Sequence, residues 1–316
     1  MEETKTKKRV GVLRGGDGDH YDTSLRQGGE VISHIHENLG SNWKVFDILI
    51  DKDNVWHLNG MPVEPAKLSE KVDVVWNASH HSLSNILESL FVPTVGPKSF
   101  SGALSESRKM LEKHMKEIGV KMPRHILLPA YLEDIDGPKD KYIIKKAREV
   151  FEKFGAPWVV KSFTLEKTMG IHLAKTYPQL IEAIADGVNH GKSILIEEFI
   201  IGKVASTHSV AGFRSGLISR NINDEQNKDI YVFPIIESLN SEEKGQLMEY
   251  AKNIFNHLGA EYYVQSNFVI NKNRGVYLTY VNFHPDLKDL SHFEQSCDVV
   301  GAKMHHVVEH MLNRAL

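Results

Sequence analysis

The chain has 316 residues, of which 41% are hydrophobic and 25% are charged, a composition typical of a globular protein with two or three compact units. Its 38 basic and 41 acidic residues give a net charge of −3, which leaves no electrostatic footprint for nucleic acid. No apolar stretch approaches the roughly 20 residues that span a bilayer, and Cys297, the single cysteine, excludes an intramolecular disulfide and any multi-cysteine metal site. We therefore expect a cytoplasmic protein that binds neither nucleic acid nor a membrane.

The first third of the chain alternates strand-like and helical segments. A buried strand from Lys8 to Leu13 leads to Gly15-Gly16, and an amphipathic helix from about Ser24 to Leu39 follows. Two strands, a short helix and a last strand come next, at 43–50, 72–76, 83–90 and 93–96. Such alternation, with glycines at the end of the first strand, predicts a parallel α/β sheet within residues 1–98.

The remainder of the chain mixes helices with strands that are joined by tight loops. Up to about residue 204 we expect an antiparallel α+β unit, with helices at 100–118, 142–154 and 177–188 and strands at 124–128, 158–163, 172–176 and 193–200. The last part is expected to hold strand-like runs at 205–213 and 217–221, a helix at 241–258, a hairpin of strands 262–270 and 276–283, and a final helix at 297–312.

Several sequence blocks resemble the D-alanine–D-alanine ligase family. The opening VGVLRGGDGDHYDTSLRQGGEVISHI is similar to the start of these enzymes, in which a strand ends in Gly-Gly before a helix that begins near a Ser-Leu pair. The blocks VVWNASHH, SGALSESRKMLEKHMKEIGVKMP, WVVKSFTLEKTMGIHLAKT, ILIEEFIIGK and YVQSNFVINKNRGVYLTYVNFHP follow in the family's order. The resemblance covers nearly the whole chain. It implies an ATP-grasp fold of α/β and α+β parts, with a Rossmann-like pre-ATP-grasp domain at 1–98 and two ATP-grasp subdomains at 99–204 and 205–316.

By this resemblance, Lys161 in Val-Val-Lys would neutralise phosphate charge on a bound nucleotide. The alternative is a solubilising lysine at the edge of a strand, which the apolar residues leading into it make the weaker reading. Glu197, Glu198 and Phe199 match the hinge that would hydrogen-bond the adenine edge, and an ordinary strand end is an equally good interpretation. ATP and Mg²⁺ are the cofactors that the family implies.

Other nucleotide contacts depart from the family's pattern. Arg108 stands where the resemblance expects a phosphate-binding lysine, and Val204 where it expects a ribose-binding glutamate. The glycine- and serine-rich phosphate loop is replaced by residues 165–170, in which Lys167 is the candidate anion contact. The lid that would follow is shortened to about 221–229.

The expected magnesium ligands are also changed. Mg²⁺ at phosphoryl-transfer sites prefers hard oxygen ligands, usually one or two carboxylates with phosphate oxygens. The family's Arg-X-Asp strand reads Gln265-Ser266-Asn267 here, and its Glu-X-Asn strand reads Tyr280-Val281-Asn282. Asn267 and Asn282 therefore remain as a metal site that has lost both carboxylates.

The amino-acid end of the site is altered in the same way. His20 stands where the resemblance places a glutamate that binds the D-alanine ammonium group, and Asp22 lies nearby as a second substrate contact. Ser24 and His80 match the family's remaining catalytic positions. The glycine-rich segment that would follow the His80-His81 pair is deleted.

Histidine is abundant, with 17 residues, but the spacing does not indicate a zinc site. The neighbours His80 and His81 are expected to point apart on a strand or helix, and the same holds for His305 and His306. We interpret these side chains as surface or hydrogen-bonded histidines.

Two functional hypotheses follow. In the first, the chain is a D-alanine–D-alanine ligase-like protein with degraded metal, phosphate and amino-acid contacts, a pseudoenzyme that binds a nucleotide or a small amino-acid-like ligand. In the second, it is an active, divergent ligase that phosphorylates a D-amino-acid carboxylate for attack by an amine, as in peptidoglycan synthesis for the cell wall, with an altered substrate. Because the metal and ribose positions have changed together with the substrate positions, the first is favoured. By resemblance we also expect a homodimer.

Overall fold

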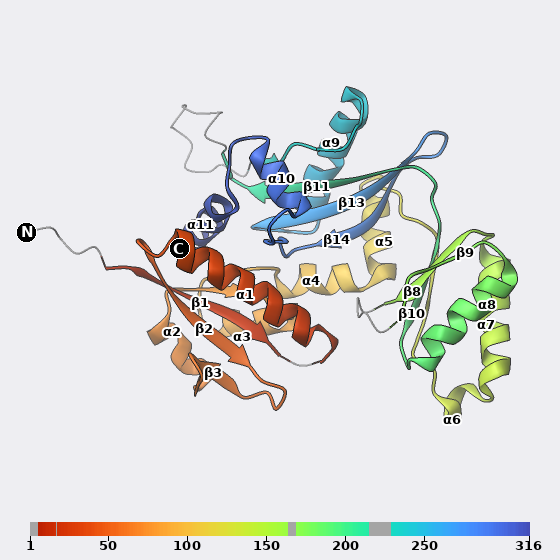
Figure 1. Cartoon of the computed structure of the whole chain (residues 1–316), viewed down its shortest axis with the longest axis horizontal. Helices are drawn as coiled ribbons and strands as arrows, with labels where there is room; N and C mark the ends of the chain where they lie inside the picture. Colours follow the sequence, from red (N-terminus) through yellow and green to blue (C-terminus); the bar gives the residue numbers. More distant parts are fainter. Residues whose placement is uncertain (1–5, 17, 164–168, 215–228) are drawn as a thin grey trace, which may run out of the picture. The chain divides into compact units, whose positions relative to one another are not determined.

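The computed structural model describes residues 6–16, 18–163, 169–214 and 229–316 (Figure 1). They form two compact units, and the first combines three stretches of chain: Met1–Val120, Val204–Phe268 and Leu278–Leu316. The second comprises Lys121–Lys203 and Val269–Tyr277. The division into three domains at residues 98 and 204 stays a prediction. None of the helices in the described ranges combines the length and the apolar character needed to cross a membrane.

The N-terminal part of the first unit is a six-stranded sheet of order β4-β3-β2-β1-β5-β6. Its strands are β1 Lys8–Gly15, β2 Trp43–Ile50, β3 Trp56–Leu58, β4 Met61–Pro62, β5 Val74–Asn77 and β6 Thr94–Val95. The four strands from β2 to β6 in this order are parallel, which confirms the expected α/β sheet, whereas β3 and β4 form an antiparallel edge. The sequence analysis did not anticipate that edge.

Helices cover both faces of this sheet (Figure 1). The elements are η1 Gly18–His20, α1 Tyr21–Asn38, η2 Pro65–Lys67, α2 Leu68–Lys71, η3 His81–Leu83 and α3 Ser84–Ser89. Val10 and Val12 of β1 share a core cluster with Val31 and Ile35 of α1. Leu13 lies in a separate cluster with side chains of β2, α2 and α3. This alternation is the period of two that a strand imposes on its side chains.

Two helices follow where one was expected. The predicted helix at 100–118 is divided into α4 Ser99–Glu106 and α5 Arg108–Glu117. Ser107 between them has an extended backbone, with φ −94° and ψ 92°, and its carbonyl accepts the N–H of Leu111. Ser107 therefore stands at the N-cap position of the new helix, where serine is favoured, although its side chain makes no capping hydrogen bond here. Glu106 becomes the last residue of α4.

The C-terminal part of the first unit is built on a second sheet of order β12-β11-β13-β14. The strands are β11 Lys203–Ala211, β12 Ile230–Val232, β13 Tyr263–Asn271 and β14 Gly275–Asn282, and the helices are α9 Ser241–His257, α10 His292–Asp298 and α11 Met304–Ala315. Adjacent β13 and β14 confirm the expected hairpin. The expected run at 217–221 lies outside the described residues, and β12 was not anticipated. A single final helix was wrong, because Gly301 adopts φ +67° between α10 and α11.

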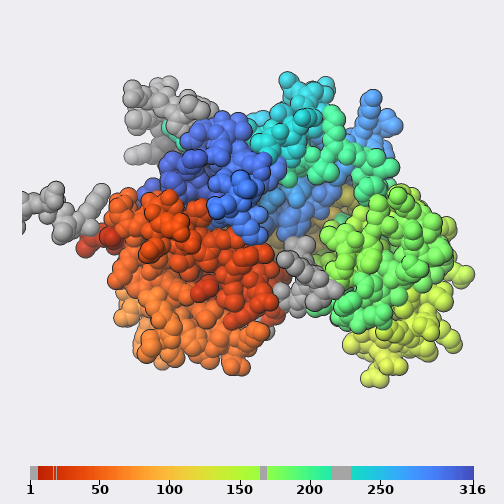
Figure 2. All heavy atoms as spheres, viewed as in Figure 1, coloured from red at the N-terminus to blue at the C-terminus, as the bar shows by residue number. Residues whose placement is uncertain are grey.

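The two parts of the first unit share one core. A single buried cluster joins side chains of β1 and α1 to Phe233, Tyr263 and Phe293 and to the apolar face of α11. In the space-filling view, the N-terminal and C-terminal segments of this unit, red to orange and blue, lie directly against one another (Figure 2). The C-terminal helices are therefore part of what stabilises the N-terminal sheet.

The second unit is an antiparallel sheet with helices on one face. Its strands are β7 His125–Leu128, β8 Trp158–Ser162, β9 His172–Ala174 and β10 Ile194–Glu198, in the order β7-β10-β8-β9, and its helices are α6 Glu133–Asp136, α7 Lys139–Lys153 and α8 Tyr177–Asn189. Trp158 and Val160 pack against α7 and α8, and the alternating pattern puts Lys161 on the opposite face. This arrangement confirms the antiparallel α+β character expected for this part of the chain, whereas α4 and α5, expected in the same unit, belong to the first unit.

Candidate functional site

A glycine turn at the end of β1 is held by two serines. Gly15 has φ +83°, and an added Cβ would lie 2.1 Å from the Ile50 carbonyl oxygen, so only glycine fits there. The Gly15 N–H donates to Ser24 Oγ at 2.9 Å, and the Ser79 hydroxyl donates to the Gly15 carbonyl. Ser24, a predicted catalytic residue, is only 2% exposed. Its hydroxyl has a structural task in fixing this turn.

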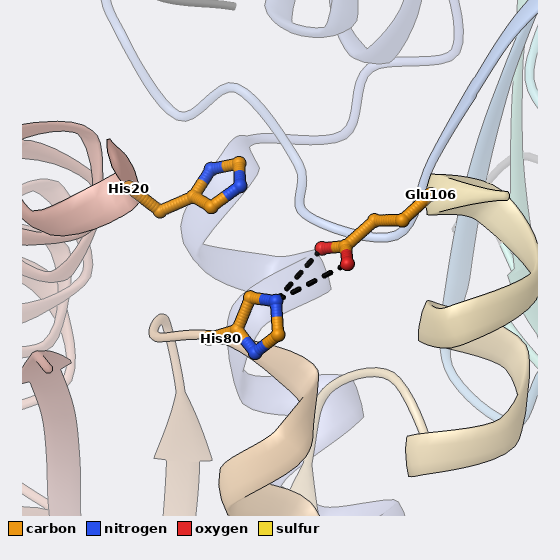
Figure 3. Close-up of side chains that lie close together, drawn as sticks. All are labelled: His20, His80 and Glu106. Atoms are coloured by element: carbon orange, nitrogen blue, oxygen red, sulfur yellow. Dashed lines mark hydrogen bonds and ion pairs between the residues drawn. The ribbon is translucent and has the colours of Figure 1, made fainter. Parts of the chain in front are cut away.

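Beyond the turn, four side chains gather in what we call the histidine–glutamate cluster: His20, His80, His81 and Glu106. His20 precedes α1, the two adjacent histidines follow β5, and Glu106 ends α4 (Figure 3). His80 Nε2 lies 3.0 Å from Glu106 Oε1, and His81 Nε2 lies 2.9 Å from Oε2. The ring centroids of His20 and His80 are 5.7 Å apart. The predicted substrate residue His20 and the predicted catalytic residue His80 are thus brought together.

The expectation that His80 and His81 point apart was wrong. Both imidazoles contact the same carboxylate, and their ring centroids are 4.2 Å apart. The rule of opposite directions holds within a regular element, whereas His80 has an extended backbone and His81 begins the 3-10 helix η3. Asp22, predicted beside His20, is exposed on the first turn of α1.

The negative charge of the histidine–glutamate cluster lies on Glu106. Burial raises the pKa of this carboxyl group, but hydrogen bonds from His80 and His81 outweigh burial and hold the pKa well below its usual range. The bond to Glu106 raises the pKa of His80. Burial, with repulsion from His20 and His81, lowers the pKa of nearby His284 to about 4, so that its ring is neutral at pH 7. The cluster combines one carboxylate with several imidazoles, and sequence spacing alone had not indicated Glu106 or His284.

The predicted metal residues lie on β13 and at the end of β14, and their polar atoms bond within the protein. Asn267 Oδ1 accepts the Ser206 hydroxyl at 2.9 Å and the Gln265 amide at 3.1 Å. Both side-chain atoms of Asn282 bond to the backbone of His284. Burial raises the pKa of the neighbouring Tyr280. Because these three positions supply no carboxylate, they do not fit the oxygen ligands that Mg²⁺ prefers at a phosphoryl-transfer site.

A second polar assembly, which we call the buried hydrogen-bond chain, comprises Tyr263, His208, His292 and Glu237. Tyr263 Oη and His208 Nδ1 are 2.7 Å apart, His208 Nε2 and His292 Nδ1 are 2.7 Å apart, and His292 Nε2 lies 3.0 Å from Glu237 Oε1. Each group can donate to the next, from the hydroxyl to the carboxylate. Burial lowers the pKa of His208 to about 3. The Ser206 N–H donates to Glu237, which links this chain to Asn267.

Sequence patterns did not indicate the buried hydrogen-bond chain. Its members come from β11, β13, α10 and the loop after β12, so no local motif records them. The available signal is a lone histidine within the apolar strand β11, since His208 is 2% exposed. A buried histidine of this kind requires a hydrogen-bonding partner.

The predicted phosphate contact Arg108 begins α5. It is 7% exposed, and its Nη1 donates to the carbonyl of Thr279 on β14 at 3.0 Å. Its guanidinium therefore fastens α5 to β14 within the first unit.

In the second unit, Lys161 Nζ forms an ion pair with Glu197 Oε2 at 2.8 Å. β8 lies between β10 and β9, so Lys161 is on an inner strand of this sheet. The Phe199 N–H donates to the Pro157 carbonyl. The assignment of these residues to nucleotide binding stays a prediction, and the candidate anion contact Lys167 lies outside the described residues.

Glu198 is held by two arginines. Its carboxylate oxygens lie 2.9 Å from Arg124 Nε and 2.6 Å from Arg274 Nη1. Burial opposes ionisation, yet the two guanidinium groups lower the pKa of Glu198 to about 2. The carboxylate therefore connects β10 to Arg124, which immediately precedes β7, and to Arg274 in the 269–277 segment.

Comparisons with known proteins show which proteins share this architecture. The family model described as the D-ala D-ala ligase C-terminus matches residues 129–313, more than half of the chain. A D-alanine–D-alanine ligase of Legionella pneumophila is 22% identical over 351 residues, which cover 96% of this chain and 94% of that protein. D-alanyl-alanine synthetase A of Vibrio cholerae superposes with a TM-score of 0.74 at 15% identity, covering 98% of each chain.

A further solved structure is the Bacillus anthracis D-alanine–D-alanine ligase complexed with ATP, with a TM-score of 0.69 at 18% identity, covering 98% of this chain and 96% of that one. The fold is thus the ATP-grasp fold of these ligases, with the Rossmann-like sheet at its N-terminus. The chain belongs to the D-alanine–D-alanine ligase family.

Proposed function

We propose that this protein binds a small amino-acid-like ligand or a nucleotide, and that it has little or none of its family's magnesium-dependent D-alanyl–D-alanine ligation. The observation that carries the proposal is the donor set at Asn267, Tyr280 and Asn282. A carboxylate supplies the negative charge that draws a divalent cation out of its hydration shell. Here the three positions offer two amides and a phenol, and the amides bond within the protein.

The phosphate side supports the same proposal. Lys161 is paired with Glu197, a carboxylate that is 5% exposed. A nucleotide phosphate approaching Lys161 would compete with this carboxylate and would be repelled by it. Arg108 donates to a backbone carbonyl and cannot be moved to a phosphate without giving up that bond. Both Lys161 and Arg108 therefore already have partners within the protein with which a phosphate would have to compete.

The amino-acid side supports a changed ligand. His20 replaces the carboxylate that would bind an ammonium group, and it faces His80 and Glu106. Imidazoles around one carboxylate offer hydrogen bonds to a ligand, and they select for positive charge less strongly than a pair of carboxylates does. We therefore place the small ligand near this cluster, and we propose a homodimer and a cytoplasmic location by analogy with the family.

Calorimetric titration with ATP, with and without Mg²⁺, tests the proposal. We expect no measurable heat, or weak binding that Mg²⁺ does not strengthen, while the Bacillus anthracis ligase under the same conditions serves as the positive control. Micromolar, Mg²⁺-dependent binding corresponds to about −8 kcal/mol and would contradict the proposal. Phosphate release and dipeptide formation from D-alanine, assayed separately, should stay at background.

One observation favours the alternative of an active, divergent ligase. Glu237 Oε2 is buried and has no hydrogen-bond partner among the described residues, and its other oxygen is linked through Ser206 to Asn267. This carboxylate is a replacement oxygen ligand for a cation. If the alternative holds, wild-type protein shows Mg²⁺-dependent phosphate release and Glu237→Gln abolishes it. If the wild type shows none, the alternative fails.

A further inference from the structure

The donor atoms of His20, His80 and Glu106 are grouped in a way that hydrogen bonding alone does not require. One donor atom from each of the three side chains lies within 4.8 Å of the others, although the residues come from three separate elements (Figure 3). Donor atoms around a tetrahedral zinc ion are about 3.3 Å apart. Small side-chain rotations therefore bring the three onto one ion.

The atoms behind these donors are also placed to support a metal. His80 Nδ1 lies 2.8 Å from Ser82 Oγ, and a hydroxyl can accept as well as donate. In this structure Nδ1 accepts the Ser82 N–H at 3.3 Å and Nε2 donates to Glu106. When an ion takes the place of the Nε2 proton, the ring proton moves to Nδ1, where the Ser82 hydroxyl can accept it. His81 Nε2 donates to Glu106 Oε2, and a bound ion would replace the 3.0 Å contact between Oε1 and His80 Nε2. Outer partners of this kind orient the ligands of protein metal sites.

The backbone is arranged to assemble the cluster. An added Cβ on Gly102 of α4 would lie 2.2 Å from the His81 Cβ, so glycine is what allows η3 to approach this helix. The interruption at Ser107 ends α4 at Glu106 and presents its side chain beside the imidazoles. Both features bring the carboxylate and the histidines together.

We propose that His20, His80 and Glu106 bind a divalent transition-metal ion, with zinc as the best fit. Two imidazoles and one carboxylate are a donor set that suits zinc and its neighbours, whereas Mg²⁺ prefers oxygen ligands throughout. Three protein ligands leave a fourth position open for water or for a ligand carboxylate. This site requires neither nucleotide binding nor ligation, so it goes beyond the function proposed above.

A second group of potential ligands, His114, Glu117 and His257, is a weaker candidate. His114 Nδ1 and His257 Nε2 are 3.0 Å apart and bond to each other, while the Glu117 oxygen lies 3.9 Å and 3.6 Å from them. The Glu117 side chain is 50% exposed. Within the described ranges no outer partner is found that orients it. This group serves as an internal control.

Calorimetric titration of the full chain with zinc chloride, after removal of metals with a chelator, provides the test. We expect about one ion per chain with a Kd near 1 µM or tighter. His20→Ala, His80→Ala and Glu106→Gln should each weaken binding at least roughly tenfold, a loss of about 1.4 kcal/mol. His114→Ala and His257→Ala should bind zinc as the wild type does. Cobalt(II) should give the intense visible absorption of a tetrahedral complex in the wild type and lose it in the first three variants.

Circular dichroism of each metal-free variant establishes that it is folded before titration, and zinc-edge anomalous diffraction from wild-type crystals locates the ion without any variant. Absence of zinc binding by the wild type would overturn the proposal. It would equally be overturned if binding survived all three cluster variants, or if it were lost in His257→Ala instead. Because ATP is absent throughout, the result is independent of the nucleotide titration.

Discussion

The histidine–glutamate cluster and the buried hydrogen-bond chain belong to the same compact unit, and they use similar residues in different ways. Each joins histidines to one glutamate. In the buried hydrogen-bond chain, both ring nitrogens of His208 and of His292 take part in one directed series that ends on Glu237. In the cluster, His80 and His81 converge on Glu106, which remains 42% exposed. A linear series uses both ring nitrogens of each histidine internally and specifies a core, whereas converging donors around a partly exposed carboxylate leave bonding capacity for a ligand.

The largest effect on stability is expected for Gly102→Ala, which changes the backbone position where α4 approaches the histidine–glutamate cluster. The new Cβ would overlap the His81 Cβ, and overpacking of this kind costs about 1–3 kcal/mol in the free energy of unfolding. Urea denaturation measures it. Gly245→Ala in α9 is the matched control, because a Cβ there meets nothing within 4 Å and should stabilise the protein by up to ~1 kcal/mol. Equal stability of Gly102→Ala and the wild type would show that η3 and α4 are not tightly apposed.

The next prediction concerns the buried chain. The pKa of His208 is about 3 in the folded protein and near 6.5 in the unfolded chain, so the unfolded chain takes up the proton first as pH falls. The contribution of His208 is complete above about pH 6.5 and is lost toward pH 3, by up to about 2 kcal/mol between pH 6.5 and pH 5.

Urea denaturation across this range should give a shallower pH dependence for His208→Gln than for the wild type. His36→Gln, at an exposed position of α1, should reproduce the wild-type slope. A wild-type slope retained in His208→Gln would mean that His208 is not the group that titrates.

The smallest effect is expected at Asn267. Aspartate has the same shape and still accepts from Ser206 and Gln265, so Asn267→Asp should fold normally. The added charge should introduce a Mg²⁺ dependence that the wild type lacks, with ATP bound roughly fivefold more tightly in the presence of Mg²⁺ than in its absence, or about 1 kcal/mol. Calorimetry compares it with Asn273→Asp, which adds the same charge at an exposed turn. Equal affinities in the two variants would show that charge at 267 does not limit metal binding.

The sequence predicted the sheets better than the helix ends. Alternating apolar residues located β1, β2 and the β13–β14 hairpin, because strand periodicity is a local property. The breaks at Ser107 and Gly301 were not foreseen, since each lies in a run whose helical spacing continues on both sides. The spacing of apolar residues shows which face of a helix is apolar, but it does not show where one helix ends and the next begins.

The candidate site was predictable only in part. The resemblance identified His20 and His80 as neighbours in function, but Glu106 lies 26 residues beyond His80 and reaches it only through the packing of α4. His208 and His292 are separated by 84 residues, so their contact is likewise invisible to spacing. Clustered and buried polar groups of this kind are set by tertiary structure, which single-sequence patterns do not contain.

The discontinuity of the first unit has a consequence for synthesis on the ribosome. The core of the second unit uses side chains from residues 126–196, so this core can form as soon as that stretch emerges. The first unit must wait, because α1 packs against α11 and their shared core includes Leu312. The segment made in the middle can thus become compact while the N-terminal sheet is still exposed on one face, where a chaperone has its opportunity to bind.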